Sequence, residues 1–503
     1  MPIRMTGLNS GLDTESIIKE LVSAKSVKIT SMKKAQTKLS WKQDAWKTLN
    51  SKIYSLYTDT VSDLRWSSTF AKKKTESSDS SVLSVIAGSE AAIGVQEAHV
   101  VSLAKAAYLT GGEISTADGG KVSASTRLTG MGISSGEKIS VTTNGKTYEL
   151  DVTEETTVND LLSKFKEAGL NASLDESNQR VFVSAKETGA DHDFTFGGNT
   201  AALSALGLVV DGSDNTAVKI DASDAELVLN KVHYKSSSNN IVVNGSTYQL
   251  KGVSAKNEDG SYRDTTVTTE NDLDGMYDTV KSFITKYNEL INEMTKLYNA
   301  DSASSYQPLT AEEKDAMTDE EVKTWETKIK DSILRRDDSL STIMNVMTET
   351  MAAGVEIDGK RVYLSSFGIS TLGYLNAEKN GQNAYHIDGD KSDEKTGSKQ
   401  DVLKTALAAN SEDVVKFFTA LGNELYTKMT SAMKRIEGTR SMYKVYNDKQ
   451  LADEYEDYTK KISEAEDKLT EYEDKWYNKF AAMEKALAQM SSKQSAISGL
   501  FSN

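Results

Sequence analysis

The sequence predicts a multidomain α+β protein, in which a terminal α-helical coiled coil and a helical-bundle domain carry a β-rich insertion of two modules. Three observations predict this fold. Apolar residues recur at steps of three and four along both ends of the chain, as in a coiled-coil seam. Helical periodicity resumes at Leu273 and continues far toward the C-terminus. Between these helical parts, residues 104–271 hold short β-branched runs that are separated by turn residues.

The first predicted element is a long helix that begins at Asp13 or Thr14, either of which can cap it, and ends at about Leu56. One seam position repeats every seven residues, at Met32, Leu39, Trp46 and Ile53. The other seam position holds Val22, Ile29, Gln36, Gln43 and Asn50. Polar residues in a seam cost stability but can fix the register. Changing the two glutamines and Asn50 together to Leu is therefore expected to stabilise the helix pair and to slow its exchange.

Strand patterns begin after Lys72. Strands are expected at 81–87, 99–103 and 180–184, and a type I′ hairpin is expected over 138–152, around Asn144-Gly145. Thr157 can cap a helix over 158–168. The pairs Gly111-Gly112 and Gly119-Gly120 are expected to mark loops. A second cassette, with strands at 225–229 and 240–250, is again built on an Asn-Gly pair, so we expect two related modules.

The helical part resumes with a helix over 273–297, followed by a polar loop over 300–320 that contains Pro308. Helical spacing returns from Val322 to Met351. Residues 363–399 are expected to form a hairpin or a loop, and residues 402–428 a helix.

The last fifty residues carry the second seam, which runs without Gly or Pro until Gly499. Its apolar positions are Leu451, Tyr455, Tyr458, Ile462, Ala465, Leu469, Tyr472, Trp476, Phe480, Met483, Leu487, Met490 and Ile497. The step from Trp476 to Phe480 is a stutter, which should locally unwind a supercoil. A helix of this length, roughly 70 Å at 1.5 Å per residue, needs a partner helix.

Charge suggests which helix is the partner. Residues 16–52 hold nine Lys against one Glu and one Asp, a balance of +7, whereas residues 448–490 hold twelve acidic residues against seven Lys, a balance of −5. Opposite net charges beside the two apolar seams favour pairing of the helices at the two chain ends. The alternative is that each helix packs locally or associates with another copy of itself.

The amino-acid composition argues against several classes of function. The 503 residues carry a net charge of −15 and no cysteine. This balance argues against a general nucleic-acid binder, and the absence of cysteine excludes disulfides and cysteine-ligated zinc. The N-terminus lacks the apolar core of a secretory signal peptide, and no run approaches 18 apolar residues. We therefore expect no membrane span and, without a specialised export route, a cytoplasmic protein.

The sequence holds no strong catalytic or metal-binding motif. Its four histidines form no H-E-x-x-H, and no G-x-S-x-G elbow occurs. The run Gly130 to Gly136 is one residue too long for a dinucleotide loop. Asp388, Asp390 and Asp393 could hold Ca²⁺, but they break the EF-hand spacing, so a solvated acidic loop is favoured. We expect no enzyme, no cofactor and no metal.

Several runs resemble the bacterial flagellar filament cap family, also called hook-associated protein 2. The stretch from Gly7 to Ile18 is similar to the opening motif of the family, and the cassette over 136–196 is similar to a β module of flagellin-related hook proteins. Further similar runs follow in the order of the family, some of them typical of its clostridial members: 280–291, 308–314, 325–326, 333–337, 364–369, 443–449 and 480–487. The resemblance covers nearly the whole chain and is weakest over 104–271.

The resemblance implies a domain plan. Residues 1–40 and 456–503 would form the coiled-coil leg, D0. Residues 41–103 and 272–455 would form the helical domain D1, and residues 104–271 would form D2 and D3, the plate. The side chains expected to hold the leg together are Met32, Leu39, Trp46, Ile53 and Ile462.

The resemblance also implies a function and partners. Several copies would form a ring at the distal tip of the filament, retain exported flagellin and promote its folding and polymerisation. The chain would be extracellular, exported through the flagellar type III secretion channel, and would also meet hook-filament junction proteins. An export chaperone would bind the C-terminal helix at Ala486, Leu487, Met490, Ile497 and Leu500.

Three alternatives remain open at this point. The chain could be a coiled-coil surface adhesin that binds host mucin or glycans through its β-rich domains, a role compatible with the cap. It could be an enzyme with a Ser or Asp site in the insertion, or a cytoplasmic tether. The exposed end formed by Ile497, Leu500 and Phe501 is expected to have a partner, and docking onto the chain's own N-terminal helix is the alternative.

Overall fold

The computed structural model describes residues 11–210 and 216–501, with side chains as far as residue 497. The chain divides into two compact units. One unit joins Met1–Phe70 to Leu273–Asn503, and the other is Ala71–Asp272. The first is predominantly helical and the second is built from antiparallel sheets. The predicted fold class, helical termini and bundle with a β-rich insertion, is thereby confirmed.

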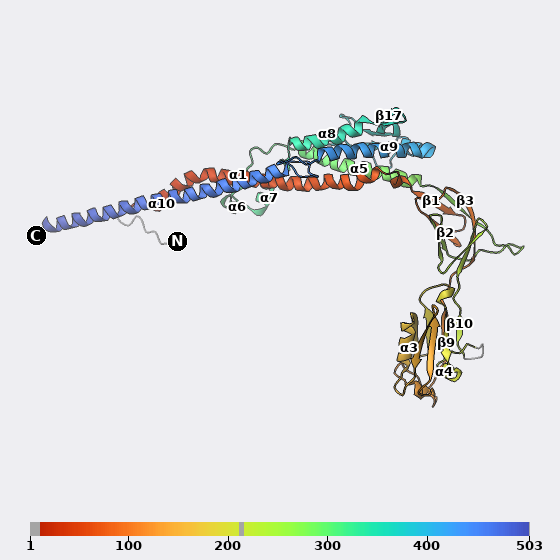
Figure 1. The fold of residues 1–503 in the computed structure, drawn as a ribbon. Coiled ribbons are helices and arrows are strands. Elements are labelled where there is room, and N and C mark those ends of the chain that lie inside the picture. Colours follow the sequence, from red (N-terminus) through yellow and green to blue (C-terminus); the bar gives the residue numbers. More distant parts are fainter. Residues whose placement is uncertain (1–10, 211–215, 502–503) are drawn as a thin grey trace. The chain divides into compact units, whose positions relative to one another are not determined.

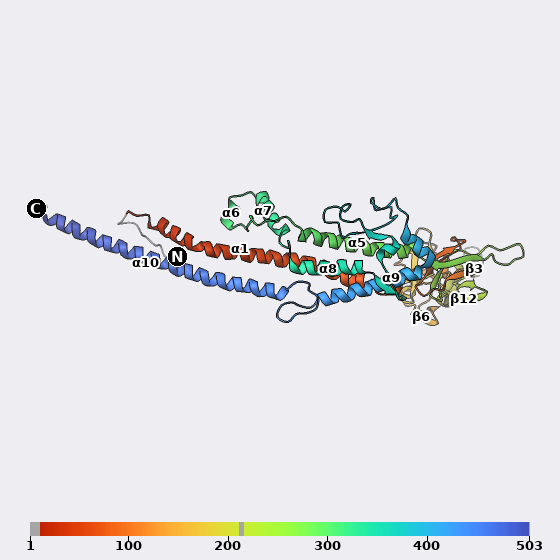
Figure 2. The ribbon, with the colours of Figure 1, turned by 90° about the horizontal axis from the view of Figure 1, so that it is seen from above.

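The helical unit is organised along two long helices that run side by side in both views (Figures 1 and 2). These are α1 (Thr14–Ser55) and α10 (Asp448–Phe501). The π-helical turn η1 (Leu56–Val61) continues α1 into α2 (Ser62–Leu64) and the short η2 (Ser67–Phe70). The rest of the bundle consists of α5 (Leu273–Tyr298), α6 (Ala311–Asp315), α7 (Asp319–Asp331), α8 (Asp338–Ala353) and α9 (Val402–Ala432).

Local sequence explains where these helices begin. Asp13 caps α1 by accepting a hydrogen bond from the backbone N–H of Ser16 at 3.0 Å. Thr310 and Thr318 each open a helix with a capping box, in which a Glu three residues later returns the bond. One apolar core, which includes Trp46, Phe283, Met347, Phe417 and Phe418, joins α1, α5, α8 and α9. The amphipathic faces read from the sequence are therefore the faces that pack.

The helical region differs from the predictions in one place. The stretch 300–320, expected to be a loop, contains α6 and the first residues of α7, because Thr310 and Thr318, the N-cap residues of the two capping boxes, lie within it. The stretch 363–399, expected to be a hairpin or loop, agrees with that expectation: after the turn η5 (Leu364–Phe367), the strands β18 (Ile369–Thr371) and β19 (Tyr385–Ile387) pair antiparallel across a long loop. A further small hairpin, β16 (Val355–Ile357) with β17 (Lys360–Val362), follows α8.

The β-rich unit contains two modules, each with its own core. The first module has a five-stranded sheet in the order β1-β15-β3-β11-β12 and a three-stranded sheet β13-β14-β2. Its strands are β1 (Lys73–Ser77), β2 (Leu83–Ala87), β3 (Gly94–Ser102), β11 (Ala225–Leu229), β12 (Val232–Ser236), β13 (Asn240–Val243), β14 (Ser246–Leu250) and β15 (Thr265–Asn271).

The strand pairing of the first module places the start of the β-rich unit earlier in the sequence than expected. The strands between Lys73 and Ser102, assigned from the sequence to D1, pair with β11, β14 and β15 from the far side of the insertion. The compact unit therefore begins at Ala71 and not at residue 104. The sequence pattern identified β2 and part of β3 as strands, but it could not show which strands they pair with.

The second module lies between β3 and β11 in the sequence. A four-stranded sheet, β10-β4-β8-β7, and a three-stranded sheet, β6-β5-β9, enclose its core together with α3 (Val158–Glu167). The remaining elements are β4 (Tyr108–Glu113), η3 (Leu128–Met131), β5 (Lys138–Thr143), β6 (Lys146–Asp151), β7 (Leu170–Asp175), β8 (Arg180–Ala185), η4 (Ala190–His192), β9 (Phe194–Gly198), α4 (Thr200–Ala205) and β10 (Val218–Ile220).

Turn chemistry was predicted well here, with one error. Asn144 (φ 52°) and Gly145 (φ 70°) form the expected left-handed pair between β5 and β6. Gly111, however, lies inside β4 and not in a loop. A Cβ at this position would meet the carbonyl oxygen of Val181 at 2.5 Å. Glycine is needed here for close packing of backbones, which the sequence pattern does not distinguish from a turn.

Candidate interaction surface of the paired terminal helices

The two terminal helices run antiparallel, and polar side chains of α1 join them. Gln43 Nε2 donates to the carbonyl oxygen of Leu451 at 2.8 Å, and Gln36 Nε2 donates to the Thr459 hydroxyl at 2.7 Å. As the α1 residue number falls, the number of its α10 partner rises. The polar seam positions thus contact the partner helix directly and fix one register.

The pair is anchored where α10 begins. Trp46 is 1% exposed, and its ring stacks on Tyr446 with centroids 5.0 Å apart. Asn50, 3% exposed, accepts from the backbone N–H of Val445 at 3.0 Å and donates to the carbonyl oxygen of Tyr443 at 3.2 Å. These contacts fasten the segment before α10 to α1.

The predicted seam residues are buried to different depths. Trp46 and Ile53 belong to the core of the bundle, and Ile462 is 7% exposed on α10. Met32 and Leu39 are half-buried. The sequence reasoning missed Tyr446 and Val445, because they precede the α10 seam and carry no helical periodicity. Both residues lie within the run 443–449, whose resemblance to the family was the signal that could have pointed to them.

Charge pairing across the two helices is sparser than their composition suggests. Between residues that the structure describes, Lys33 with Glu466, at 2.6 Å, is the single ion pair that joins α1 to α10. Other lysines of α1 turn to the bundle: Lys34 pairs with Glu313, Lys42 with Asp337 and Lys52 with Glu293. The positive charge of α1 therefore also positions α5, α6 and the N-terminus of α8.

A groove of about 590 Å³ runs between α1 and α10 beyond these contacts. Ile29, Met32, Ala465, Leu469 and Tyr472 form its apolar floor. Its rim is formed by Lys25, Lys28, Lys461, Lys468 and Glu464. The groove is thus apolar within and mainly basic at its edges.

The distal part of α10 carries the residues proposed for a chaperone. Met490 is 67% exposed and Ile497 is 55% exposed, while Leu487 is half-buried. The side chains of Leu500 and Phe501 lie outside the described residues. The helix continues without a break through Trp476 and Phe480, whose ring centroids are 5.9 Å apart.

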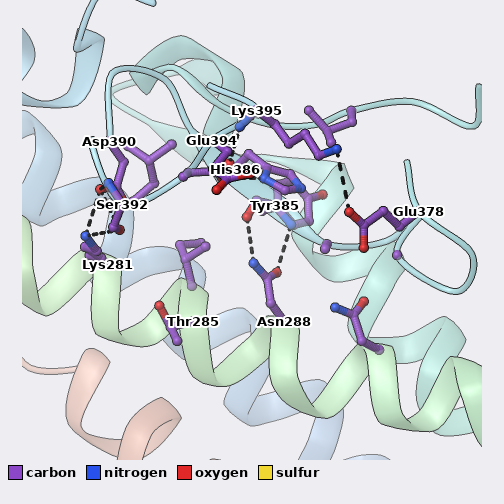
Figure 3. Close-up of a pocket in the computed structure, with 17 residues that line it drawn as sticks. Lys281, Thr285, Asn288, Glu378, Tyr385, His386, Asp390, Ser392, Glu394 and Lys395 are labelled. Carbon is purple, nitrogen blue, oxygen red and sulfur yellow. Dashed lines mark hydrogen bonds and ion pairs between the residues drawn. The ribbon is translucent and has the colours of Figure 1, made fainter. Parts of the chain in front are cut away.

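The acidic loop that could have held Ca²⁺ lies against α5 and lines a cavity of about 390 Å³ (Figure 3). Its carboxylates are divided among separate partners. Asp390 binds Lys281 Nζ at 2.8 Å, Asp393 binds His386, and Asp388 binds Lys399 at 2.8 Å. In the described chain no three His, Cys, Asp or Glu side chains gather as a metal site would need.

The charged and polar groups of this loop attach it to α5, and they are not arranged as a catalytic or metal-binding site would require. Burial alone would raise the pKa of Asp390, but hydrogen bonds from Lys281 and Ser392 hold it below its ordinary value. Asn288, labelled in Figure 3, donates to the carbonyl oxygen of Tyr385 and accepts from its N–H. Burial raises the pKa of the neighbouring Tyr287 well above its ordinary value. These bonds tie the loop to α5.

Of the helices in residues 11–210 and 216–501, none combines the length and the apolar composition that crossing a bilayer requires.

Comparison with known proteins gives consistent matches over the whole chain. A family model described as flagellar hook-associated protein 2 C-terminus matches residues 222–492, and one described as its N-terminus matches residues 10–107. The chain is 21% identical to flagellar hook-associated protein 2 of Halalkalibacterium halodurans, over 99% of this chain and 100% of the relative. It is 26% identical to the A-type protein of Pseudomonas aeruginosa, over 58% and 63% of the two chains. The crystal structure of the D1-D2-D3 domains of the Escherichia coli flagellar cap protein matches with a TM-score of 0.47 and 19% identity, covering 82% of this chain and 95% of that one.

Proposed function

The chain belongs to the flagellar hook-associated protein 2 family, the family of the flagellar filament cap, and we propose that it retains exported flagellin at the distal end of the filament and promotes its folding and polymerisation. Members of this family are structural proteins and not enzymes. The alternative of a mucin-binding adhesin gains no support from the relatives, all of which are described as flagellar hook-associated or cap proteins.

The observation that supports this role best is the antiparallel pair of α1 and α10, with 42 and 54 residues. A cap that advances with each added subunit must hold the filament and then release it. Half-buried and polar seam positions, such as Gln36 and Met32, make the pair open to exchange. Exposed ion pairs such as Lys33 with Glu466 contribute only about 1 kcal/mol or less.

The finer parts of the proposal concern partners and location. Several copies form a ring at the distal tip of the flagellum, and their paired helices, the D0 legs, contact flagellin and, before the first flagellin is added, hook-filament junction proteins. The chain reaches the tip through the flagellar type III secretion channel. Before export, a chaperone covers the distal part of α10, a role supported by the exposure of Met490 and Ile497.

Deletion of the gene in the bacterium that carries it tests the cap role. Without the protein, we expect flagellin in the growth medium and short or absent filaments, and the intact chain should restore both. Immunogold labelling should place the restored protein at filament tips. Full-length filaments in the deletion strain, or label only along filament sides, would contradict the proposal.

A further inference from the structure

The groove between α1 and α10 has a charge pattern that the pairing of these helices does not explain. The two helices carry opposite net charges, yet four lysines converge on this one groove, Lys25 and Lys28 from α1 and Lys461 and Lys468 from α10. Like charges on facing helices cost stability. The register therefore leaves a positive rim where pairing alone would favour mixed charges.

The contacts within the rim neutralise only part of this charge. Lys461 pairs with Asp457 at 2.5 Å, and Lys25 Nζ lies 5.5 Å from the centroid of the Tyr472 ring. Among the residues that the structure describes, Glu464 is the one acidic side chain that lines the groove. Four lysines thus face one glutamate of the groove and one aspartate beside it, which leaves an excess of positive charge.

The floor of the groove is suited to another helix. Ala465 occupies a seam position between Ile462 and Leu469, and its small side chain leaves the seam hollow there. Half-buried Met32, Leu469 and Tyr472 expose apolar surface to this hollow. Apolar residues at helical spacing, bordered by one sign of charge, are the features of a groove that receives an amphipathic helix.

We propose that this groove binds an amphipathic helix with acidic flanks from a partner protein, as the third helix of a local bundle. The inference rests on the proposed cap function, in which the legs contact a filament subunit, and it assigns that contact to this groove. The acidic flanks meet the lysine rim, and the apolar seam of the partner fills the space above Ala465.

A second copy of this chain is a poorer occupant. The acidic first part of α10 already turns its apolar seam toward α1, as the burial of Ile462 shows. The distal part of α10 exposes Met490 and Ile497, but residues 485–497 hold Lys485 and Lys493 and no acidic residue. That segment would bring like charge to the rim.

Binding of a designed probe to the purified full chain tests the inference. The probe is a labelled four-heptad peptide with Leu at both seam positions and Glu at the flanking positions, and its counterpart carries Lys at the flanks. By fluorescence anisotropy, we expect the acidic peptide to bind at least about tenfold more tightly than the basic one. Lys28→Glu with Lys468→Glu should abolish or reverse this preference.

Two further variants distinguish binding in the groove from a general effect of the net charge of the protein. Lys323→Glu with Lys379→Glu changes the net charge equally at exposed sites away from the groove and should leave the preference unchanged. Ala465→Phe should fill the hollow and abolish binding, while the melting temperature by circular dichroism stays the same or rises.

Three results would overturn the inference: equal binding of both peptides, equal loss of binding in the distant charge variant, or a change in oligomeric state of Lys28→Glu with Lys468→Glu, which would make a second copy the occupant. None of these results would affect the cap role, because flagellin retention is measured separately in the deletion strain.

Discussion

Replacing Asn50 by Leu should destabilise the base of the helix pair, although leucine is the better residue for an ordinary coiled-coil seam. Asn50 is 3% exposed and holds the backbone of Val445 and Tyr443 by one hydrogen bond each. The sequence alone treats it like Gln36, as a polar interruption whose removal stabilises the pair. The structure separates the two positions, because Gln36 bonds a hydroxyl on a more exposed part of α10.

The magnitude follows from three contributions. The buried backbone N–H of Val445 loses the Asn50 Oδ1 acceptor, which costs about 1–3 kcal/mol. A methyl group at the position of Oδ1 or Nδ2 would lie 3.0–3.2 Å from backbone atoms, and relieving such overpacking costs about 1–3 kcal/mol. Burial of the added apolar surface returns about 2 kcal/mol. The balance is a loss of about 2 kcal/mol, whereas Gln36→Leu should be neutral or stabilise by up to about 1 kcal/mol.

Hydrogen–deuterium exchange read by mass spectrometry measures this effect locally, which is preferable because a multidomain chain does not unfold in one step. In Asn50→Leu, peptides covering 440–455 should exchange about thirtyfold faster, the equivalent of 2 kcal/mol. The matched control Gln36→Leu should leave these peptides unchanged or slower. If Asn50→Leu exchanged as slowly as wild type, the reasoning that its two backbone bonds outweigh apolar burial would be refuted.

Three other predictions concern the rest of the chain. Hydrogen bonds hold the pKa of Asp390 below 3.8, so its stabilising contribution is full above that value and is lost as pH falls through the folded pKa. Asp390→Asn should therefore flatten the decline in exchange protection of residues 385–400 below about pH 4. Gly111→Ala should destabilise the second β module by about 1–3 kcal/mol, because a Cβ there meets a carbonyl oxygen of β8. The control variant Gly130→Ala should leave the stability unchanged, because there is open space around Gly130. Thermal melts of the two variants measure the difference. Trp46→Ala removes a buried ring stacked on Tyr446 and should cost about 3–5 kcal/mol, seen as a lower urea midpoint of the helical signal, and an unchanged midpoint would show that this stack does not anchor α10.

Sequence predicted most accurately the features that depend on neighbouring residues. Thr157 was predicted to cap a helix over 158–168, and the structure has α3 there, with Thr157 and Asp160 forming a capping box. The Asn144-Gly145 turn was likewise predicted with its conformation, since few other pairs tolerate two positive φ angles. What failed depends on distant partners. Gly111 is required by a strand seventy residues away, and no local pattern distinguishes that need from a turn.

The terminal helices, which hold the candidate site, show the same difference between features that depend on neighbouring residues and features that depend on distant partners. Periodicity and opposite charge predicted that α1 and α10 could pair, because both are properties of each helix alone. The register is a property of the pair, and it decides what each charge does. The observed register sends Lys34, Lys42 and Lys52 to the bundle and brings Lys28 and Lys468 to one groove. Net charge therefore indicates which helices can meet, but the positions of single lysines determine what surface the pair presents to a third partner.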